Sequence, residues 1–227
     1  MAHLSKKLER KTNADDVFDF LHGQIVSLQL LPGTRISEVE IARQFDVSRQ
    51  PVREAFIRLA NLDLLLIRPQ KATMVRRFSS EKIKRARFIR MAVECEILRR
   101  ACRLATNLHH QRLQQDLESQ RAAIRSRDIE KFHSLDYDFH RHLCDAGHSA
   151  LMFGTISENK ALVDRLCVLS LSEPAAMEEL FDDHFRIAEK LKEQNEDAVI
   201  TAITEHLSRL DDVIAGIRNS HADFFED

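Results

Sequence analysis

Glycine, proline and tryptophan are scarce in this chain of 227 residues. Five glycines and four prolines are too few to supply the many turns of an all-β sandwich or barrel, so a mostly α-helical fold is favoured. Tryptophan is absent and tyrosine occurs once, whereas phenylalanine occurs 13 times. Hydrophobic residues make up 44% of the chain, which is enough to bury a core and excludes a disordered tail.

The sequence also lacks a disulfide framework and a membrane-spanning run. Its cysteines form no Cys-x-x-Cys pair and lie within apolar helical patterns, so we expect free thiols in a reducing compartment: Cys95, Cys102, Cys144 and Cys167. No apolar run approaches the roughly 20 residues that a membrane helix needs. Residues 1–12 are polar and basic and form no apolar signal. We therefore expect a cytoplasmic protein that makes no contact with a membrane.

Charge is distributed unevenly along the chain, although the net charge is only −2. Residues 1–78 hold 13 lysines and arginines against 9 aspartates and glutamates, a net of +4. The chain totals of 34 and 36 then leave 21 against 27, a net of −6, for residues 79–227. A basic segment joined to an acidic one is typical of a nucleic-acid-binding head on a body with another task. We predict two domains with these boundaries.

The apolar spacing of residues 1–78 predicts a winged helix-turn-helix. Three amphipathic helices are expected, at about residues 15–31, 37–45 and 48–62. Ser37 and Glu40 have the spacing of a capping box at the start of the second helix. About three residues separate the second and third helices, which is the signature of a helix-turn-helix. Two short strands, at 64–67 and 73–75, follow as a small β-hairpin, the wing, with its tip at 68–72.

Residues 79–227 are predicted to form an antiparallel helical bundle without strands. Ser79 or Ser80 begins a long helix, and five more are expected at about 110–126, 128–146, 149–171, 175–193 and 196–218. Ligand and metal sites in such bundles are usually built from inward side chains of facing helices.

Two segments of the N-terminal domain resemble GntR-family transcription regulators. Residues Val47–Ala55 read Val-Ser-Arg-Gln-Pro-Val-Arg-Glu-Ala, as at the start of that family's recognition helix. Residues Leu31–Glu38 read Leu-Pro-Gly-Thr-Arg-Ile-Ser-Glu and match the family at the right distance upstream. The resemblance implies a repressor or activator of the FadR-like subfamily with an FCD-type helical domain at residues 79–227. It also implies a homodimer that binds a short palindromic operator of double-stranded DNA, and not an enzyme.

Six residues are candidates for DNA contact: Arg35, Ser48, Arg49, Gln50, Arg53 and Lys71. Ser48 lies at a helix N-terminus, where free N–H groups bind phosphate. Arg49 and Arg53 are four residues apart on one helical face, and the resemblance places them in the major groove, where arginine reads guanine through paired hydrogen bonds. The glutamine beside Arg49 can reach a base or a phosphate. Arg35, at the start of the second helix, and Lys71, at the wing tip, are phosphate candidates.

Two positions of the wing depart from the family's pattern. Relatives usually have glycine before the first wing strand and at the wing tip, where this chain has Asp63 and Ala72. Both residues adopt a left-handed backbone less readily than glycine. We therefore expect the wing to approach the minor groove less closely.

One aspartate and three histidines of the C-terminal domain form a candidate metal site. Asp136 and His140 are four residues apart on one helical face, while His184 and His206 occupy apolar faces of the last two helices. An Asp-x-x-x-His pair is common, so spacing alone favours ordinary core or surface histidines over metal ligands. The FCD resemblance fills all four positions as metal ligands and assigns His148 to the turn that follows. Such a set suits a divalent ion, with zinc preferred over nickel, manganese and iron.

The resemblance also implies an effector, because FCD domains sense small organic acids and sugar acids. Four protein ligands on an octahedral metal would leave two positions for the carboxylate and hydroxyl of such an acid. Arg90 matches a position of the family's first FCD helix and is predicted to neutralise a second carboxylate. Arg165 is a candidate for the same role, and an ordinary salt bridge is the alternative for both arginines.

Two other functions are compatible with part of these features. One is a metal-dependent enzyme fused to a nucleic-acid-binding head, and the other is a regulator whose metal is purely structural. The chain has no His-Glu-x-x-His motif, no nucleophile elbow and no phosphate-binding glycine loop, which argues against the enzyme.

Overall fold

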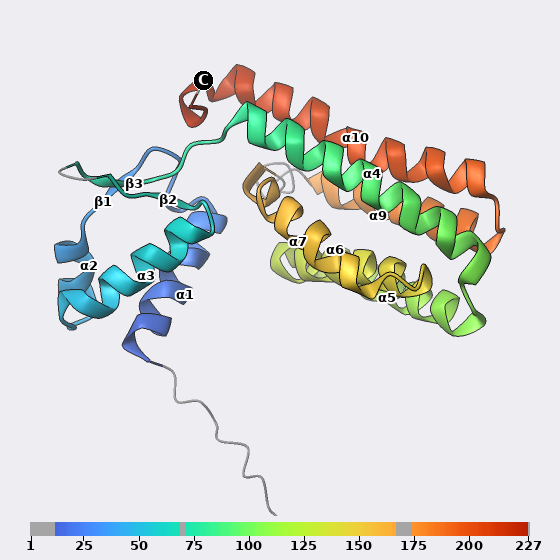
Figure 1. The fold of residues 1–227 in the computed structure, drawn as a ribbon, viewed down its shortest axis with the longest axis horizontal. Helices are drawn as coiled ribbons and strands as arrows, with labels where there is room; N and C mark the ends of the chain where they lie inside the picture. Colours follow the sequence, from blue (N-terminus) through green and yellow to red (C-terminus); the bar gives the residue numbers. More distant parts are fainter. Residues whose placement is uncertain (1–11, 69–70, 167–173, 227) are drawn as a thin grey trace, which may run out of the picture. The chain divides into compact units, whose positions relative to one another are not determined.

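The computed structural model describes residues 12–68, 71–166 and 174–226 of the chain (Figure 1). The chain divides into two compact units, Met1–Phe78 and Ser79–Asp227. The first combines three helices with a small sheet and the second is built from helices, which confirms the fold class predicted from the sequence. No helix in the described ranges is long and apolar enough to cross a membrane.

The first unit is a winged helix-turn-helix. Its elements are α1 (Asn13–Val26), β1 (Arg35–Ile36), α2 (Glu38–Gln44), α3 (Arg49–Asn61), β2 (Leu65–Leu66) and β3 (Thr73–Val75). The strands form one antiparallel sheet in the order β1-β3-β2. Met74 of β3 lies opposite Arg35 on one side and Leu66 on the other, so the wing strand β3 is held between two neighbours.

The apolar spacing of α1 and α3 explains how these helices pack. Val17, Leu21 and Ile25 recur every fourth residue on α1 and are fully buried, as are Val52 and Phe56 on α3. Burying each such side chain contributes about 1.5–3 kcal/mol relative to leaving it exposed. This seam fixes α3 against α1 and leaves the opposite face of α3 exposed to solvent.

Three details of the first unit differ from the sequence prediction. The helix α1 ends at Val26 instead of near residue 31, because Leu28 adopts a left-handed backbone with a φ of 60° that a helix does not continue through. The predicted capping box of Ser37 and Glu40 is wrong: Ser37 caps α2 only through its carbonyl, which accepts from the Ile41 N–H. The two-residue strand β1 was not predicted.

In its described residues, the second unit is a bundle of α-helices with two short 3-10 segments. Its elements are α4 (Ser80–Leu104), α5 (Asn107–Ser126), α6 (Ile129–Ala146), η1 (Ala150–Met152), α7 (Phe153–Ala161), α9 (Pro174–Lys192), α10 (Glu196–Ser220) and η2 (Ala222–Phe224). Helix α5 packs on α6 and α9, and α10 packs on α4 and α9 (Figure 1). Helices from distant parts of the sequence therefore face one another across the interior.

The single helix predicted at 149–171 is wrong. The structure has η1 and then α7, which ends at Ala161 before a turn at residues 162–163. At this turn the backbone hydrogen bonds join residues three apart instead of four. The Val163 N–H donates to the Lys160 carbonyl, and the Leu166 N–H donates to the Val163 carbonyl. Residues 167–171 of the prediction lie outside the described residues.

The end of α6 lies unusually close to α4. A Cβ atom at Gly147 would lie 2.6 Å from the Ile97 carbonyl oxygen, so glycine is required there for this contact. Cys95, Cys102 and Cys144 are free, buried thiols as expected, and Cys167 is outside the described residues. Burial raises the pKa of the Cys144 thiol to about 12, so the thiol stays protonated at neutral pH.

Candidate functional site

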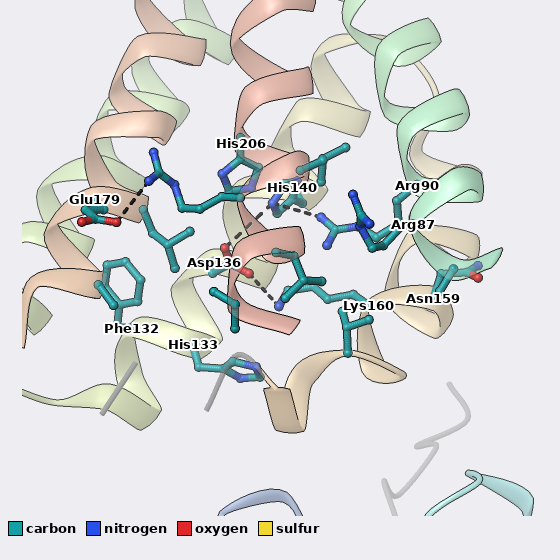
Figure 2. Close-up of a pocket in the computed structure, with 18 residues that line it drawn as sticks. Arg87, Arg90, Phe132, His133, Asp136, His140, Asn159, Lys160, Glu179 and His206 are labelled. Atoms are coloured by element: carbon teal, nitrogen blue, oxygen red, sulfur yellow. Dashed lines mark hydrogen bonds and ion pairs between the residues drawn. The ribbon is translucent and has the colours of Figure 1, made fainter. Parts of the chain in front are cut away.

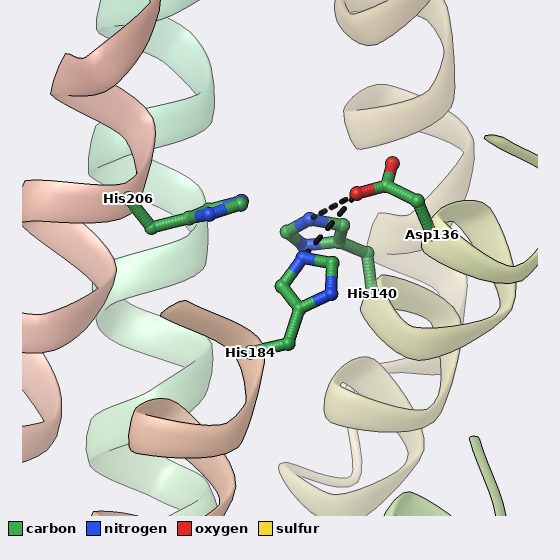
Figure 3. A group of neighbouring side chains, drawn as sticks. All are labelled: Asp136, His140, His184 and His206. Atoms are coloured by element: carbon green, nitrogen blue, oxygen red, sulfur yellow. Dashed lines mark ion pairs between the residues drawn. The ribbon is translucent and has the colours of Figure 1, made fainter. Parts of the chain in front are cut away.

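The four residues predicted to bind metal meet in the interior of the second unit (Figure 3). Asp136 and His140 extend from successive turns of α6, His184 from α9 and His206 from α10. Each offers a ligand atom, and these atoms all lie within 4.8 Å of one another. All four side chains are buried. The cluster can hold a metal ion.

The imidazoles are oriented by oxygen atoms behind them. Each Nδ1 lies near a side-chain oxygen of another residue: His140 near Glu94 at 2.6 Å, His184 near Gln120 at 2.9 Å and His206 near Asp183 at 3.5 Å. Nδ1 of His184 is hydrogen-bonded to Gln120, which leaves Nε2 of that ring available, whereas the carboxylates near Nδ1 of His140 and His206 are close without hydrogen-bond geometry. Metal-binding histidines are typically held in this way by a carboxylate or carbonyl on the nitrogen away from the metal.

Asp136 completes the cluster through one oxygen. Its Oδ1 lies 3.3 Å from Nε2 of His184 and 3.9 Å from Nε2 of His140. Its other oxygen, Oδ2, lies 2.8 Å from Nζ of Lys160. A nitrogen-and-oxygen donor set of this kind is typical of zinc and other divalent transition metals and not of calcium.

The protonation states also fit a metal site. Burial lowers the pKa of His184 and lowers that of His206 to about 4, so both rings are neutral near pH 7. Burial alone would raise the pKa of Asp136, yet the Lys160 ammonium and the nearby imidazoles hold it well below its ordinary value. The Arg90 guanidinium, against the effect of burial, likewise keeps the pKa of Glu94 low. Neutral imidazoles and charged carboxylates are the forms that bind metal.

A pocket opens on the cluster (Figure 2). Asp136, His140 and His206 line it together with an apolar wall of Ala86, Phe132, Val163, Ala176, Leu180, Leu207, Leu210 and Val213. Four cationic side chains also line it: Arg87, Arg90, Lys160 and Arg209. The structure brings Arg90 to the site, with Nη2 3.4 Å from Nε2 of His140. Arg165 is buried but is not among the lining residues.

Sequence reasoning missed the residues that surround the four candidate ligands. Glu94 and Gln120 lie in helices that look like ordinary amphipathic segments, and Lys160 and Asp164 have the four-residue spacing of a surface ion pair. What distinguishes these polar residues is that they are buried, and burial depends on the tertiary fold. His148 lies in the turn after α6 with a φ of 49° and is outside the cluster, as predicted.

The predicted DNA-contacting residues lie on the surface of the first unit. Ser48, Arg49, Gln50 and Arg53 are exposed on the N-terminal part of α3, and Ser48 is its N-cap without a side-chain hydrogen bond. Nη2 of Arg49 lies 3.0 Å from Oε2 of Glu38.

The wing carries a second group of cations. Arg35 lies on strand β1 and not at the start of α2, which corrects its predicted position. It lines a hollow with Arg68, Lys71, Ala72 and Met74. Arg68 was not predicted as a DNA contact.

Asp63 adopts a left-handed backbone in the turn before β2. Its φ is 59°, and its Oδ1 lies 2.9 Å from Nε of Arg76. The salt bridge offsets part of the backbone strain, so the turn into β2 forms without glycine. How closely the wing approaches the minor groove remains a prediction.

Comparison with known proteins identifies the chain. Residues 13–75 match the family described as bacterial regulatory proteins, gntR family, and residues 86–209 match the FCD domain. The chain belongs to the GntR family and carries an FCD domain. It is a DNA-binding transcription regulator and not an enzyme.

Individual relatives agree with this assignment. The HTH-type transcriptional repressor RspR of Escherichia coli is 37% identical over 211 residues, which cover 93% of this chain and 92% of the relative. A probable D-xylose utilization operon transcriptional repressor of Paenarthrobacter nicotinovorans is 29% identical over 90% of this chain and 89% of its own. McbR/YncC of E. coli has the same fold, with a TM-score of 0.69 at 20% identity over 90% of this chain and 98% of that one.

Proposed function

We propose that this GntR regulator binds its operator as a homodimer and that a small carboxylate metabolite, bound beside a divalent metal in the FCD domain, changes its operator affinity. The observation that carries the proposal is the buried cluster of Asp136, His140, His184 and His206, with an oxygen atom near each Nδ1 and a cation-lined pocket beside it. We place the protein in the cytoplasm, where its DNA target lies.

The charge of the interior supports a divalent ion. Among the described residues, the buried charged side chains of the second unit are five carboxylates and three cations: Glu94, Asp116, Asp136, Asp164 and Asp183 against Arg90, Lys160 and Arg165. Asp183 is paired with the partly exposed Arg209, whose Nε lies 2.8 Å from its Oδ2, so the other four carboxylates exceed the three cations by one. Buried charge that is not balanced is costly, so this remaining negative charge favours a cation at the cluster. Zinc suits the donor set best, and nickel, manganese and iron are compatible with it.

The pocket favours an acidic effector. When bound, the metal supplies a positive centre that attracts and orients a carboxylate. Arg90 stands beside His140 and is held by Glu94, whose Oε1 lies 2.7 Å from Nε of Arg90. A guanidinium fixed in this way is prepared to receive a second carboxylate or a hydroxyl oxygen. An organic acid or a sugar acid has these groups.

The head supports specific recognition of DNA by two chains together. One helix-turn-helix reads only a few base pairs, and a two-fold pair of heads reads a palindrome. Arg49 and Arg53 would contact base edges, Gln50 a base or phosphate, and Ser48 with Arg35 and Lys71 the backbone. The names of the relatives favour a repressor.

The metal is tested by elemental analysis of the purified wild type and of a His184→Ala, His206→Ala double variant, with His110→Ala as the control. His110 lies on α5, outside the cluster. We expect one divalent ion per chain in the wild type and control, and none in the double variant. Equal metal content in all three proteins would refute the site.

The effector is tested by screening organic and sugar acids for a shift in melting temperature, and then for a change in operator affinity by fluorescence anisotropy. The expected result is one acid class that acts on the metal-loaded wild type and not on the double variant. Metal loss without any change in effector response would assign the metal a purely structural role.

A further inference from the structure

A lysine is buried beside the metal cluster, where a positive charge opposes a bound cation. Lys160 lies at the end of α7 and its side chain is almost fully buried. Its Nζ lies 2.8 Å from Oδ2 of Asp136 (Figure 2). This Nζ also lies 2.9 Å from Oδ1 of Asp164. The same Nζ lies 4.4 Å from the centre of the Tyr137 ring. The lysine is thus fixed by three neighbours.

A second layer holds Asp164 in place. The Tyr137 hydroxyl donates to Oδ2 of Asp164, and Nε2 of His133 lies 3.2 Å from its Oδ1. Burial alone would raise the pKa of Asp164, but Lys160 and His133 lower it to about 2, so it is charged. Asp164 therefore balances Lys160 independently of Asp136. Lys160 already has a counter-ion in Asp164, so neutralising Asp136 is not its only role.

The contact with Lys160 gives the two oxygens of Asp136 different neighbours. Oδ1 lies nearest the imidazoles, 3.3 Å from Nε2 of His184, whereas Oδ2 is engaged by the ammonium. A carboxylate held in this way offers one oxygen to a metal. The ammonium also draws electron density from the carboxylate and repels a nearby cation, and such charge effects are strong in a buried site.

We propose that Lys160 restricts Asp136 to a single metal-ligating oxygen and weakens metal binding, which leaves room beside the metal for an oxygen of the acidic effector. This inference rests on the metal site proposed above and concerns its regulation. Lys160 is a positioning residue for the metal site, and it also lines the effector pocket.

The test measures metal affinity in the full-length protein by competition with a chelator, using Zn²⁺ and Co²⁺. Replacing Lys160 by methionine should tighten Zn²⁺ binding by about tenfold or more, because the repelling charge is removed. This direction separates the proposal from a merely structural role, since damage to the site would weaken metal binding. Lys160→Arg should restore affinity close to the wild-type value. Lys190→Met, a surface substitution on α9, is the control and should change nothing.

The ligand geometry is read from the absorption spectrum of bound Co²⁺. In Lys160→Met both Asp136 oxygens become available, so the visible bands should shift and added acetate should alter them less than in the wild type. A folded Lys160→Met protein with unchanged or weaker metal affinity would overturn the inference while leaving the proposed metal site intact. A wild-type protein that takes up no metal would instead overturn the proposed function.

A charge-balanced variant covers the case in which Lys160→Met does not fold. The double change Lys160→Met, Asp164→Asn removes the lysine together with its own counter-ion. It should again bind Zn²⁺ more tightly than the wild type. Weaker binding by the folded double variant would overturn the inference.

Discussion

Gln120 offers the sharpest test of how the imidazoles are oriented. It lies on α5 and is fully buried. Its Oε1 lies 2.9 Å from Nδ1 of His184, and its Nε2 donates to the Leu135 carbonyl at 3.3 Å. The second bond fixes the orientation of the amide, so that its oxygen faces the histidine. Nδ1 of His184 then carries the proton, and Nε2 is left as the metal-binding nitrogen.

Replacing Gln120 by leucine removes Oε1, and the buried Nδ1–H of His184 then has no hydrogen-bond acceptor from residue 120. An unsatisfied buried donor costs about 1–3 kcal/mol. Loss of a residue that orients a ligand typically weakens metal binding by about 10–100-fold, which corresponds to about 1.4–2.8 kcal/mol. The first figure lowers the stability of the fold, and the second is the loss in metal affinity that we expect.

The assay is chelator competition with Zn²⁺ on the wild type, Gln120→Leu and the control Gln115→Leu. Gln115 lies on the same helix with its side chain exposed, so the control repeats the chemical change outside the site. Circular dichroism checks that each variant is folded. Equal metal affinity in folded Gln120→Leu and the wild type would refute the argument that Gln120 orients His184.

Three further predictions concern the rest of the chain. Arg49→Ala and Arg53→Ala should each weaken operator binding by about 1–3 kcal/mol in gel shifts, and wild-type affinity in both variants would contradict the assignment. Hydrogen bonds from Thr12 and Arg58 lower the pKa of Asp15 to about 2 from 3.8, so its contribution to stability is present above pH 4 and is lost as the pH falls towards 2. In Asp15→Asn, denaturant unfolding monitored between pH 5 and 2 should therefore depend less on pH, and an unchanged pH dependence would contradict this. A fragment of residues 79–227, one compact unit, should remain dimeric in sedimentation, and a monomer at micromolar concentration would contradict a dimer interface in that unit.

Local patterns in the sequence predicted the helices of the head and most of those in the body. Val17, Leu21 and Ile25 follow the helical period, and their burial in the structure is what that period predicts. The break after Ala161 was not predictable in this way, because Lys160 and Asp164 have helical spacing across it. Strand β1 was missed because it exists only through pairing with β3, more than thirty residues later in the chain.

The candidate site was predictable only in part, for the same physical reason. Asp136 and His140 share a helical face, but nothing in their spacing places them near His184 and His206, and the family resemblance supplied that link. The groups behind the histidines carry no motif. Asp183, for example, looks like a surface acid next to His184, yet it faces His206 and is held by Arg209 at 2.8 Å. Contacts between distant helices decide which polar residues are buried.

The proposed regulation has a thermodynamic consequence that does not depend on the path between the two domains. A ligand shifts an equilibrium only by its difference in affinity for the two states. If the acid weakens operator binding tenfold, a coupling of about 1.4 kcal/mol, then operator DNA must weaken acid binding by the same factor. Arg90 and Glu94 both lie on α4, which begins at Ser80, immediately after the boundary between the units. Calorimetric titration of the effector with and without saturating operator measures how DNA changes acid affinity. Anisotropy with and without saturating acid measures how the acid changes operator affinity. Unequal factors would mean that the acid acts through another species, such as a change in the dimer itself.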